Sequence, residues 1–163
     1  MTKKINTKLT KLLKYYNLIN YNLIYDNQSI NRYKKNKANI SGNKELLLKN
    51  LENSIENIKN CELKKNATDI VFADGHPDSK IMIVAEGPGA SEDEEGLPFL
   101  GRAGKLLDKM LHSINLSRDS VYITNVVNYR PPENRRPTEK EIKRYLPFLI
   151  NHIEIINPKI LIL

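Results

Sequence analysis

The sequence predicts an α/β fold, a three-layer α/β/α sandwich built around a parallel sheet. Short apolar runs at residues 81–84, 121–127 and 158–163 have the composition of buried parallel strands. Stripes of apolar residues at helical spacing lie between these runs. The order strand, helix, strand, helix, strand is typical of parallel strands joined by right-handed crossovers.

Two helices are predicted before the first of these strands. Residues 8–18 and residues 44–59 both place apolar side chains at helical spacing. Residues 20–43, which separate the two, are polar and without a pattern, as is typical of a loop or linker.

The second half of the chain gives clearer helix signals. Apolar residues on one face predict an amphipathic helix over residues 103–114. Thr138 and Glu141 form a capping box that begins another helix, which Pro147 is expected to kink or delay. His112 and His152 fall on these two helices, and we expect both at the surface or its edge.

The positive charge of the chain is unevenly distributed. The formal net charge is +7, and all of the excess lies in residues 1–80, because residues 81–163 carry equal numbers of basic and acidic residues. A basic region of this kind either binds nucleic acid, by releasing counterions from phosphates, or merely keeps the chain in solution.

The composition also bears on the compartment. The chain has one cysteine, Cys61, which fits a reducing environment. It has no run of about 18 apolar residues and no signal-type N-terminus, so we expect a cytoplasmic protein without a membrane partner.

A glycine-rich, acidic loop follows the first predicted strand, AEGPGASEDEEGLPFLGRAG at residues 85–104. A phosphate-binding loop would require a Gly-Lys-Ser/Thr ending, which is absent. A metal site would use the carboxylates of residues 92–95, but consecutive carboxylates point in diverging directions. A third interpretation is a ligand-binding lip at the carboxyl end of the strand, where Glu86 supplies a carboxylate and Phe99 a flat ring.

The motifs at residues 85–111 and 121–138 resemble the family 4 uracil-DNA glycosylases, a family that also includes phage-type DNA-polymerase-related proteins. The family pattern runs roughly GEAPG-xx-ED-xx-G-x-PF-x-G-x-AG-x-LLD and then YITN-x-x-x-x-RPP-x-NR-x-P. Here the matching stretches read AEGPGASEDEEGLPFLGRAGKLLDKML and VYITNVVNYRPPENRRPT. The resemblance covers about residues 58–163 and implies a uracil-DNA glycosylase-like sandwich.

The resemblance implies roles for four residues. Phe99 is expected to stack on a uracil flipped out of the DNA. Asn125 is expected to read the edge of uracil, because a carboxamide both accepts and donates hydrogen bonds. Glu86 and the backbone of Gly87 are expected to position the attacking water and one uracil oxygen, and the carboxylate to stabilise positive charge on the sugar. Candidate phosphate contacts are Ser91, Arg102, Arg130, Arg135 and Arg136.

The cluster positions depart from the family. Many members hold a 4Fe–4S cluster on four cysteines. Here Cys61 occupies the second position, and Ile58, Tyr129 and Tyr145 occupy the first, third and fourth. We therefore predict no iron–sulfur centre and no other metal, and a buried, structural role for Cys61.

The second family motif, which bears a catalytic His-Pro, is absent after the last predicted strand. We interpret residues 58–163 as the N-terminal part of a glycosylase-like domain whose outer strand is missing, and residues 1–57 as a basic, partly helical extension. The predicted function is hydrolysis of the N-glycosidic bond of uracil in DNA during base-excision repair, weak or absent in this shortened chain. A separately encoded C-terminal half is one way to complete the site. The alternative is a non-catalytic remnant or a weak DNA-binding fragment.

Overall fold

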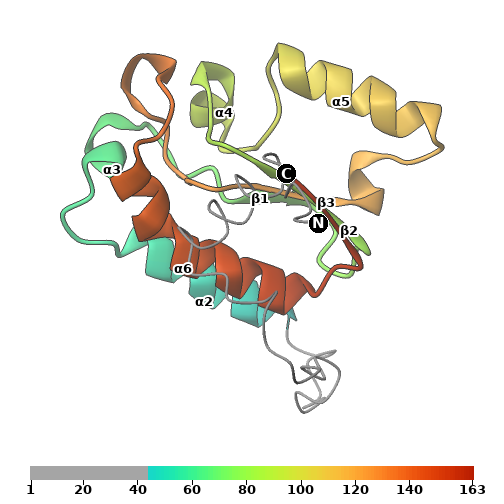
Figure 1. The fold of residues 1–163 in the computed structure, drawn as a ribbon, viewed down its shortest axis with the longest axis horizontal. Coiled ribbons are helices and arrows are strands. Elements are labelled where there is room, and N and C mark those ends of the chain that lie inside the picture. Colours follow the sequence, from blue (N-terminus) through green and yellow to red (C-terminus); the bar gives the residue numbers. More distant parts are fainter. Residues whose placement is uncertain (1–43) are drawn as a thin grey trace, which may run out of the picture. The chain divides into compact units, whose positions relative to one another are not determined.

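A four-stranded sheet lies at the centre of the computed structural model, which describes residues 44–163. Its strands follow the order β1-β3-β2-β4 (Figure 1). Their bounds are β1 Ala73–Gly75, β2 Ile81–Ala85, β3 Tyr122–Asn125 and β4 Ile160–Ile162. The α/β class is confirmed, and the predicted helix over residues 8–18 lies outside the described residues.

The three strands expected from the sequence are parallel. Met82 is paired with Tyr122 and Ala85 with Asn125 between β2 and β3, and β4 runs parallel along the other edge of β2. The sheet is nevertheless mixed, because β1 pairs with β3 in the antiparallel direction. This strand was missed because its sequence, Ala-Asp-Gly, is short and carries no apolar alternation.

Helices cover both faces of the sheet (Figure 1). Helices α2 (Lys44–Glu56) and α6 (Glu139–Ile156) pack on one face, and α4 (Ala90–Glu95) and α5 (Arg102–Ser113) lie on the other. Short elements complete the fold, namely α3 Glu62–Asn66 and the 3₁₀ turns η2 Arg118–Ser120 and η3 Pro132–Asn134. The three layers expected from the sequence are therefore present.

Helix α6 begins as its capping box predicts. The Thr138 hydroxyl accepts a hydrogen bond from the Glu141 amide, and the Glu141 carboxylate accepts one from the Thr138 amide at 2.6 Å. The helix continues through Pro147 to Ile156, so the proline does not delay its start.

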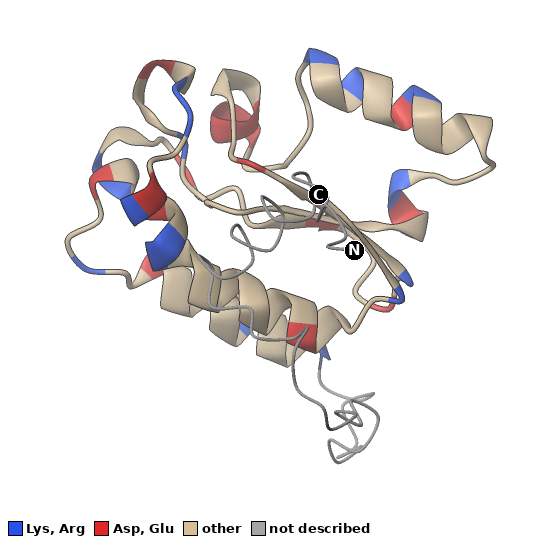
Figure 2. Ribbon diagram, in the orientation of Figure 1, with Lys and Arg blue, Asp and Glu red and all other residues tan. Residues whose placement is uncertain are grey.

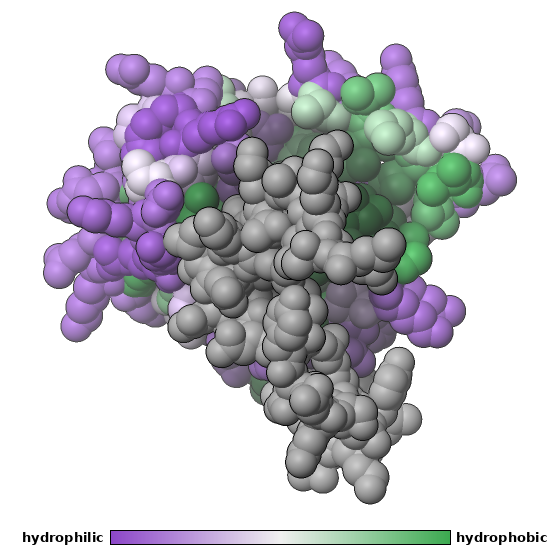
Figure 3. All heavy atoms as spheres, viewed as in Figure 1, coloured by the Kyte–Doolittle hydropathy of each residue, from purple (hydrophilic) through white to green (hydrophobic). Residues whose placement is uncertain are grey.

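The two faces of the sheet bury separate apolar clusters. Strand residues alternate between the faces, so that Met82 and Tyr122 pack towards α2 and α6, whereas Ile83 and Ile123 pack with Leu111 of α5. The apolar face predicted for α5 is only partly covered. Its exposed side chains are Leu106, Met110 and Ile114, and Figure 3 shows apolar surface in this region.

His152 is buried, which corrects the expectation that it lies at the surface. Its side chain is 1% exposed, and a hydrogen bond of 2.9 Å joins His152 Nε2 to the Tyr122 hydroxyl. The ring also lies 4.6 Å from that of Phe72, measured between centroids. Burial lowers the pKa of His152 to about 4, so the imidazole is neutral at physiological pH.

This buried imidazole predicts a pH-dependent stability. In the unfolded chain His152 titrates near its ordinary pKa of about 6.5, so the unfolded state binds more protons between pH 6.5 and pH 4. As the pH falls through this window, the chain is expected to lose about 3 kcal/mol of unfolding free energy, with no change from this residue above it. Urea unfolding at pH 4 to 7 measures the loss.

Two variants isolate this contribution. The difference in unfolding free energy between the parent chain and His152→Gln is expected to shrink as the pH falls. The difference for Asn115→Gln, a change at an exposed position between two side chains that do not titrate, is expected to stay constant. A His152→Gln difference that does not depend on pH would contradict the account.

Candidate active site

The connections of the sheet diverge at the carboxyl ends of β2 and β3. The chain leaves β2 towards α4 and α5 on one face, and leaves β3 towards α6 on the other. Open α/β sheets bind their ligands where neighbouring connections diverge in this way. Ala85 and Asn125 are paired at this point, and the pairing continues as the Val127 amide donates to the Glu86 carbonyl at 3.3 Å. Glu86 and Asn125 therefore lie at the same edge.

Asn125 is a buried polar residue with an unused donor. It is 3% exposed, and its Nδ2 atom has no hydrogen-bond partner. Strand alternation places its side chain on the same face as Ile123, the face covered by α5. A buried donor without a partner destabilises a fold by about 1–3 kcal/mol. Such a group at the carboxyl end of a strand is suited to donate to a bound molecule.

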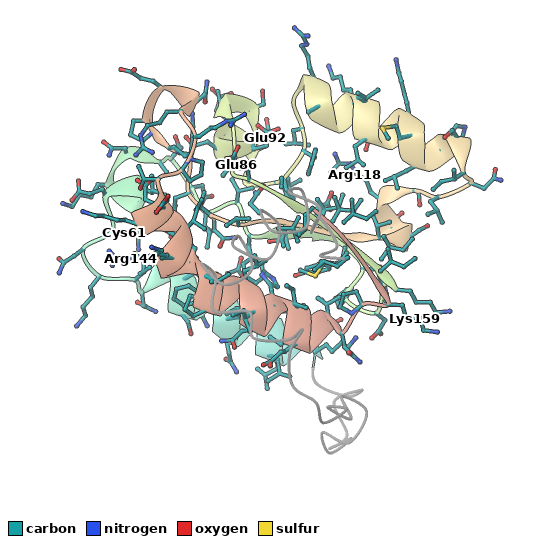
Figure 4. The ribbon with its side chains drawn as sticks, in the orientation of Figure 1. Cys61, Glu86, Glu92, Arg118, Arg144 and Lys159 are labelled. Atoms are coloured by element: carbon teal, nitrogen blue, oxygen red, sulfur yellow. The ribbon has the colours of Figure 1, made fainter. Side chains whose placement is uncertain are left out.

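Gly87 lies close to the strand segment beside it. A Cβ atom at this position would lie 2.8 Å from Cγ2 of Val127, so a larger residue would require the Val127 side chain or the loop to shift. Glu86, the preceding residue, is exposed, and its Oε2 atom lies 3.9 Å from Nε of Arg136. Figure 4 shows Glu86 and Glu92 near one another on the side of α4.

The Glu92 carboxylate joins the two ends of the glycine-rich loop. Oε1 accepts hydrogen bonds from the amides of Leu100 at 2.9 Å and Gly101 at 2.8 Å, and Oε2 accepts from Gly89 at 3.1 Å. Partial burial raises the pKa of Glu92, but these amide bonds outweigh burial and hold the pKa below its ordinary value. The carboxylate thereby fixes the segment that leads into α5.

Asp93 is the second acid of α4 with a structural contact. It is 2% exposed, its Oδ1 atom accepts a hydrogen bond from the Thr68 amide at 3.0 Å, and its Oδ2 atom lies 3.8 Å from Nη1 of Arg130. Glu92 and Asp93 therefore stabilise the conformation of this turn. Figure 2 shows α4 as a strongly acidic element. Within residues 44–163, no three His, Cys, Asp or Glu side chains gather into a metal site.

Phe99 lies on the same face of the sheet as Asn125. Its ring is half-buried and packs against the cluster that contains Ile83 and Ile123. Its backbone has a φ of 57°, the left-handed region that a phenylalanine rarely adopts. A Cβ atom on Gly104 would overlap the Phe99 carbonyl, so α5 begins directly against this turn.

The candidate phosphate contacts differ in their exposure and in their present hydrogen-bond partners. Ser91, Arg102 and Arg136 are exposed. Arg135 is held by Glu141, with N–O distances of 2.9 and 2.7 Å. This hydrogen-bonded pair lowers the pKa of Glu141 to about 2. Arg130 is half-buried and donates to Asn134 at 2.8 Å.

The four positions that hold the cluster in many family members lie together in one apolar cluster. Cys61, Tyr129 and Tyr145 are buried in it, and Ile58 packs against it. A contact of 3.2 Å joins Cys61 Sγ to the Tyr145 hydroxyl. Burial raises the pKa of Tyr129 to about 12, so its hydroxyl stays protonated. One thiol beside an isoleucine and two tyrosines does not supply the four thiolates that a 4Fe–4S cluster needs.

Arg118 is a polar residue at this site that the sequence analysis did not select. It precedes β3 and binds the backbone of Pro98 and Phe99. No motif marks it, because its partners come from segments that are distant in the sequence. An acidic residue in β1, Asp74, was missed for the same reason.

A separate cavity of about 500 Å³ lies between α2 and α6. These helices cover the face of the sheet opposite to Asn125, so this cavity is separate from the site at the carboxyl ends of β2 and β3. Its lining includes Leu47, Leu51 and Phe148.

Comparison with known families identifies the superfamily of the chain. The model of the uracil DNA glycosylase superfamily matches residues 72–163, and the chain belongs to this superfamily. The chain is 47% identical to the type-4 uracil-DNA glycosylase of Sulfurisphaera tokodaii over 116 residues, which are 71% of this chain and 53% of that protein. It is 42% identical to the type-4 enzyme of Thermotoga maritima over 119 residues, which are 73% of this chain and 62% of that protein.

A DNA polymerase of Bacillus phage SP01 is also similar, with 39% identity over 89 residues, 54% of this chain and 10% of the polymerase. The resemblance to the type-4 glycosylases and to phage polymerase-related proteins is thus confirmed. The chain spans just over half of the length of the curated glycosylases that it matches. No helix within residues 44–163 is both long enough and apolar enough to cross a membrane.

The Glu92 contacts predict a specific loss of stability. Glu92→Gln removes the charge that three amides share, and charge-assisted hydrogen bonds contribute more than neutral ones. The expected loss is about 1–3 kcal/mol of unfolding free energy at pH 7, measured by urea unfolding. Glu94→Gln, in the same helix but exposed, is the matched control and is expected to change stability little. Equal effects of the two substitutions would contradict the role of Glu92.

Proposed function

We propose that this protein is a uracil-DNA glycosylase of base-excision repair that hydrolyses the N-glycosidic bond of uracil flipped out of DNA. The observation that carries the proposal is the unpartnered, buried Nδ2 of Asn125 at the end of β3. Uracil presents an acceptor, O4, next to a donor, N3–H. One carboxamide complements both, because Nδ2 donates and Oδ1 accepts. Cytosine presents the opposite pattern and is rejected.

Phe99 and Gly87 complete the pocket in this proposal. The Phe99 ring, on the face that carries Asn125, stacks on the extruded base. The backbone of Gly87, which has no side chain to obstruct approach, binds a uracil oxygen. The family resemblance assigns these roles, and the positions of the residues support them.

Glu86 supplies the carboxylate for the reaction. Cleavage of the glycosidic bond builds positive charge on the sugar, and a nearby carboxylate stabilises that charge and orients water. Glu86 is exposed at the carboxyl end of β2, where a bound nucleotide has access to it. Nε of Arg136 lies 3.9 Å from Oε2 of Glu86, so a basic group that could bind a DNA phosphate lies beside the carboxylate.

DNA is held through phosphate contacts around the carboxyl ends of β2 and β3. Ser91, Arg102 and Arg136 are exposed candidates. Arg130 and Arg135 already bind Asn134 and Glu141, so a phosphate would share these guanidinium groups with, or replace, those partners. The basic residues before position 81 add attraction that does not depend on base sequence. Binding of this kind falls with rising salt.

The iron–sulfur cluster of the family has been lost in this chain, and side-chain packing replaces it. The contact between Cys61 and Tyr145 and the burial of Tyr129 support this proposal. Iron analysis of the purified protein tests it, and four iron atoms per chain would contradict it.

The glycosylase-like domain begins near residue 58, and residues 1–57 form an extension whose last helix, α2, packs against α6. A second polypeptide segment completes the domain beside β4, either in the same protein or encoded separately. The exposed side chains of β4 and the greater length of the relatives support this part of the proposal. The place of action of the protein in this proposal is the cytoplasm, as for a DNA-repair protein in which no helix within residues 44–163 could span a membrane.

A second candidate function is weak DNA binding without catalysis. It is favoured by the excess of basic residues before position 81, which attracts DNA phosphates without taking part in cleavage. The two functions differ in whether an abasic product forms.

An excision assay separates the two functions. The purified protein, alone and with the C-terminal part of a type-4 relative, is incubated with single- and double-stranded oligonucleotides that contain one uracil. Abasic product is expected with uracil and not with cytosine. Asn125→Asp is expected to lower the rate by about 10²-fold or more, because the carboxylate no longer donates to O4.

The matched control is Asn115→Asp, which makes the same change at an exposed loop position and is expected to leave the rate unchanged. Absence of abasic product under every condition would refute the catalytic proposal. DNA binding that persists in that case would support the second candidate.

A further inference from the structure

The guanidinium of Arg118 connects three separate parts of the structure. Nη1 donates to Asp74 of β1 at 2.6 Å, and Nε donates to Asp108 of α5 at 2.8 Å. Nη1 also donates to the Pro98 carbonyl at 3.1 Å, and Nη2 donates to the Phe99 carbonyl. Figure 4 shows Arg118 beneath α5, towards the sheet.

These contacts differ from those of an ordinary surface ion pair. The Arg118 side chain is 23% exposed and that of Asp74 is 26% exposed, so solvent screens their attraction only in part. Burial lowers the pKa of Arg118, but the hydrogen bonds to Asp74 and Asp108 outweigh burial and raise it. The planar fork of arginine is needed to reach acceptors in several directions at once, which a lysine ammonium cannot do.

Arg118 is itself held in place by β1. Gly75 has a φ of 90°, and a Cβ atom there would lie 2.8 Å from the Arg118 carbonyl and overlap that of Val121. The His76 amide donates to the Val121 carbonyl at 3.0 Å, which secures η2 against the end of β1. The short antiparallel strand therefore provides both an acceptor for Arg118 and a support for its backbone.

The segment that Arg118 binds adopts an unfavourable backbone conformation. Phe99 has a positive φ, and non-glycine residues retain such a conformation only when their surroundings enforce it. Arg118 donates to the carbonyl of Phe99 and to that of Pro98 before it. Helix α5 packs against the Phe99 carbonyl through Gly104. The direction of the Phe99 ring depends on this backbone.

We propose that Arg118 is a positioning residue of the uracil pocket, which fixes the Pro98–Phe99 turn so that the Phe99 ring faces the base beside Asn125. The inference rests on the proposed function for the stacking role of Phe99. Arg118 itself does not touch the substrate. It acts by reducing the freedom of Phe99 before the base enters, and a small displacement of a positioning group lowers rates by up to about 10²-fold.

The first test measures Phe99 directly and does not depend on activity. The chain contains three phenylalanines, so ring-labelled phenylalanine gives a simple NMR spectrum in which Phe99→Leu assigns the signal of interest. Arg118→Met and Arg118→Lys are both expected to shift or broaden the Phe99 signal and to leave that of Phe148 unchanged. A lysine that restores the parent signal would contradict the need for the guanidinium fork.

Arg144→Met is the matched control. Arg144 also binds backbone carbonyls, those of Lys59 and Asn60, but from α6. Its loss is expected to leave the Phe99 signal unchanged. If Arg118→Met does not fold, Asp108→Asn removes one partner of Arg118 and is expected to produce a smaller change of the same signal. An unaltered Phe99 signal in every folded variant at positions 108 and 118 would overturn the proposal.

The second test measures whether the position of the Phe99 ring affects uracil excision. Excision of uracil by Arg118→Lys is expected to fall by about 10- to 100-fold, while the Kd for DNA without uracil stays the same. A selective NMR change without any excision by the parent protein would refute the proposed function and leave the positioning of Phe99 supported. An NMR change in Arg118→Lys without a change in excision would overturn the role of Arg118 in the pocket.

Discussion

The parallel pairing of β2 and β3 is the constraint on which the rest of the site depends. It places the end of one strand beside the end of the other, with Ala85 opposite Asn125. The two connections then diverge to opposite faces of the sheet, towards α4 and α5 from β2 and towards α6 from β3. The glycine-rich loop therefore begins beside Asn125, and the proposed uracil pocket is built on this pairing.

Two charged side chains hold the loop that leaves β2. Glu92 accepts amide hydrogen bonds from both ends of the loop, and Arg118 donates to the carbonyls next to Phe99. One side chain is an acceptor for backbone N–H groups and the other a donor to backbone C=O groups. Together they satisfy polar groups that a glycine-rich segment cannot pair within itself. The Glu92 carboxylate therefore serves the conformation of the loop.

The fold was largely predictable, because its signals are local, and the two motifs gave the candidate site residues. The apolar runs gave β2, β3 and β4, the capping box gave the beginning of α6, and the motif around Asn125 gave the family. What the sequence did not reveal depends on distant partners. β1 pairs with β3, which lies much further along the chain, and the buried His152 contacts Tyr122 and Phe72. The apolar face of α5 was expected to be buried, but the sheet covers only part of it, and Leu106 and Met110 are exposed.

The most direct measurement of the central claim is the response of the Asn125 side-chain amide to a base. In an ¹⁵N spectrum of the protein, the Asn125 Nδ2 resonance can be assigned by Asn125→Asp. Addition of a single-stranded oligonucleotide with one uracil is predicted to shift this resonance as Nδ2 gains its acceptor. The same oligonucleotide with cytosine in place of uracil is predicted to leave it unshifted. No shift with uracil, or equal shifts with both bases, would contradict the account.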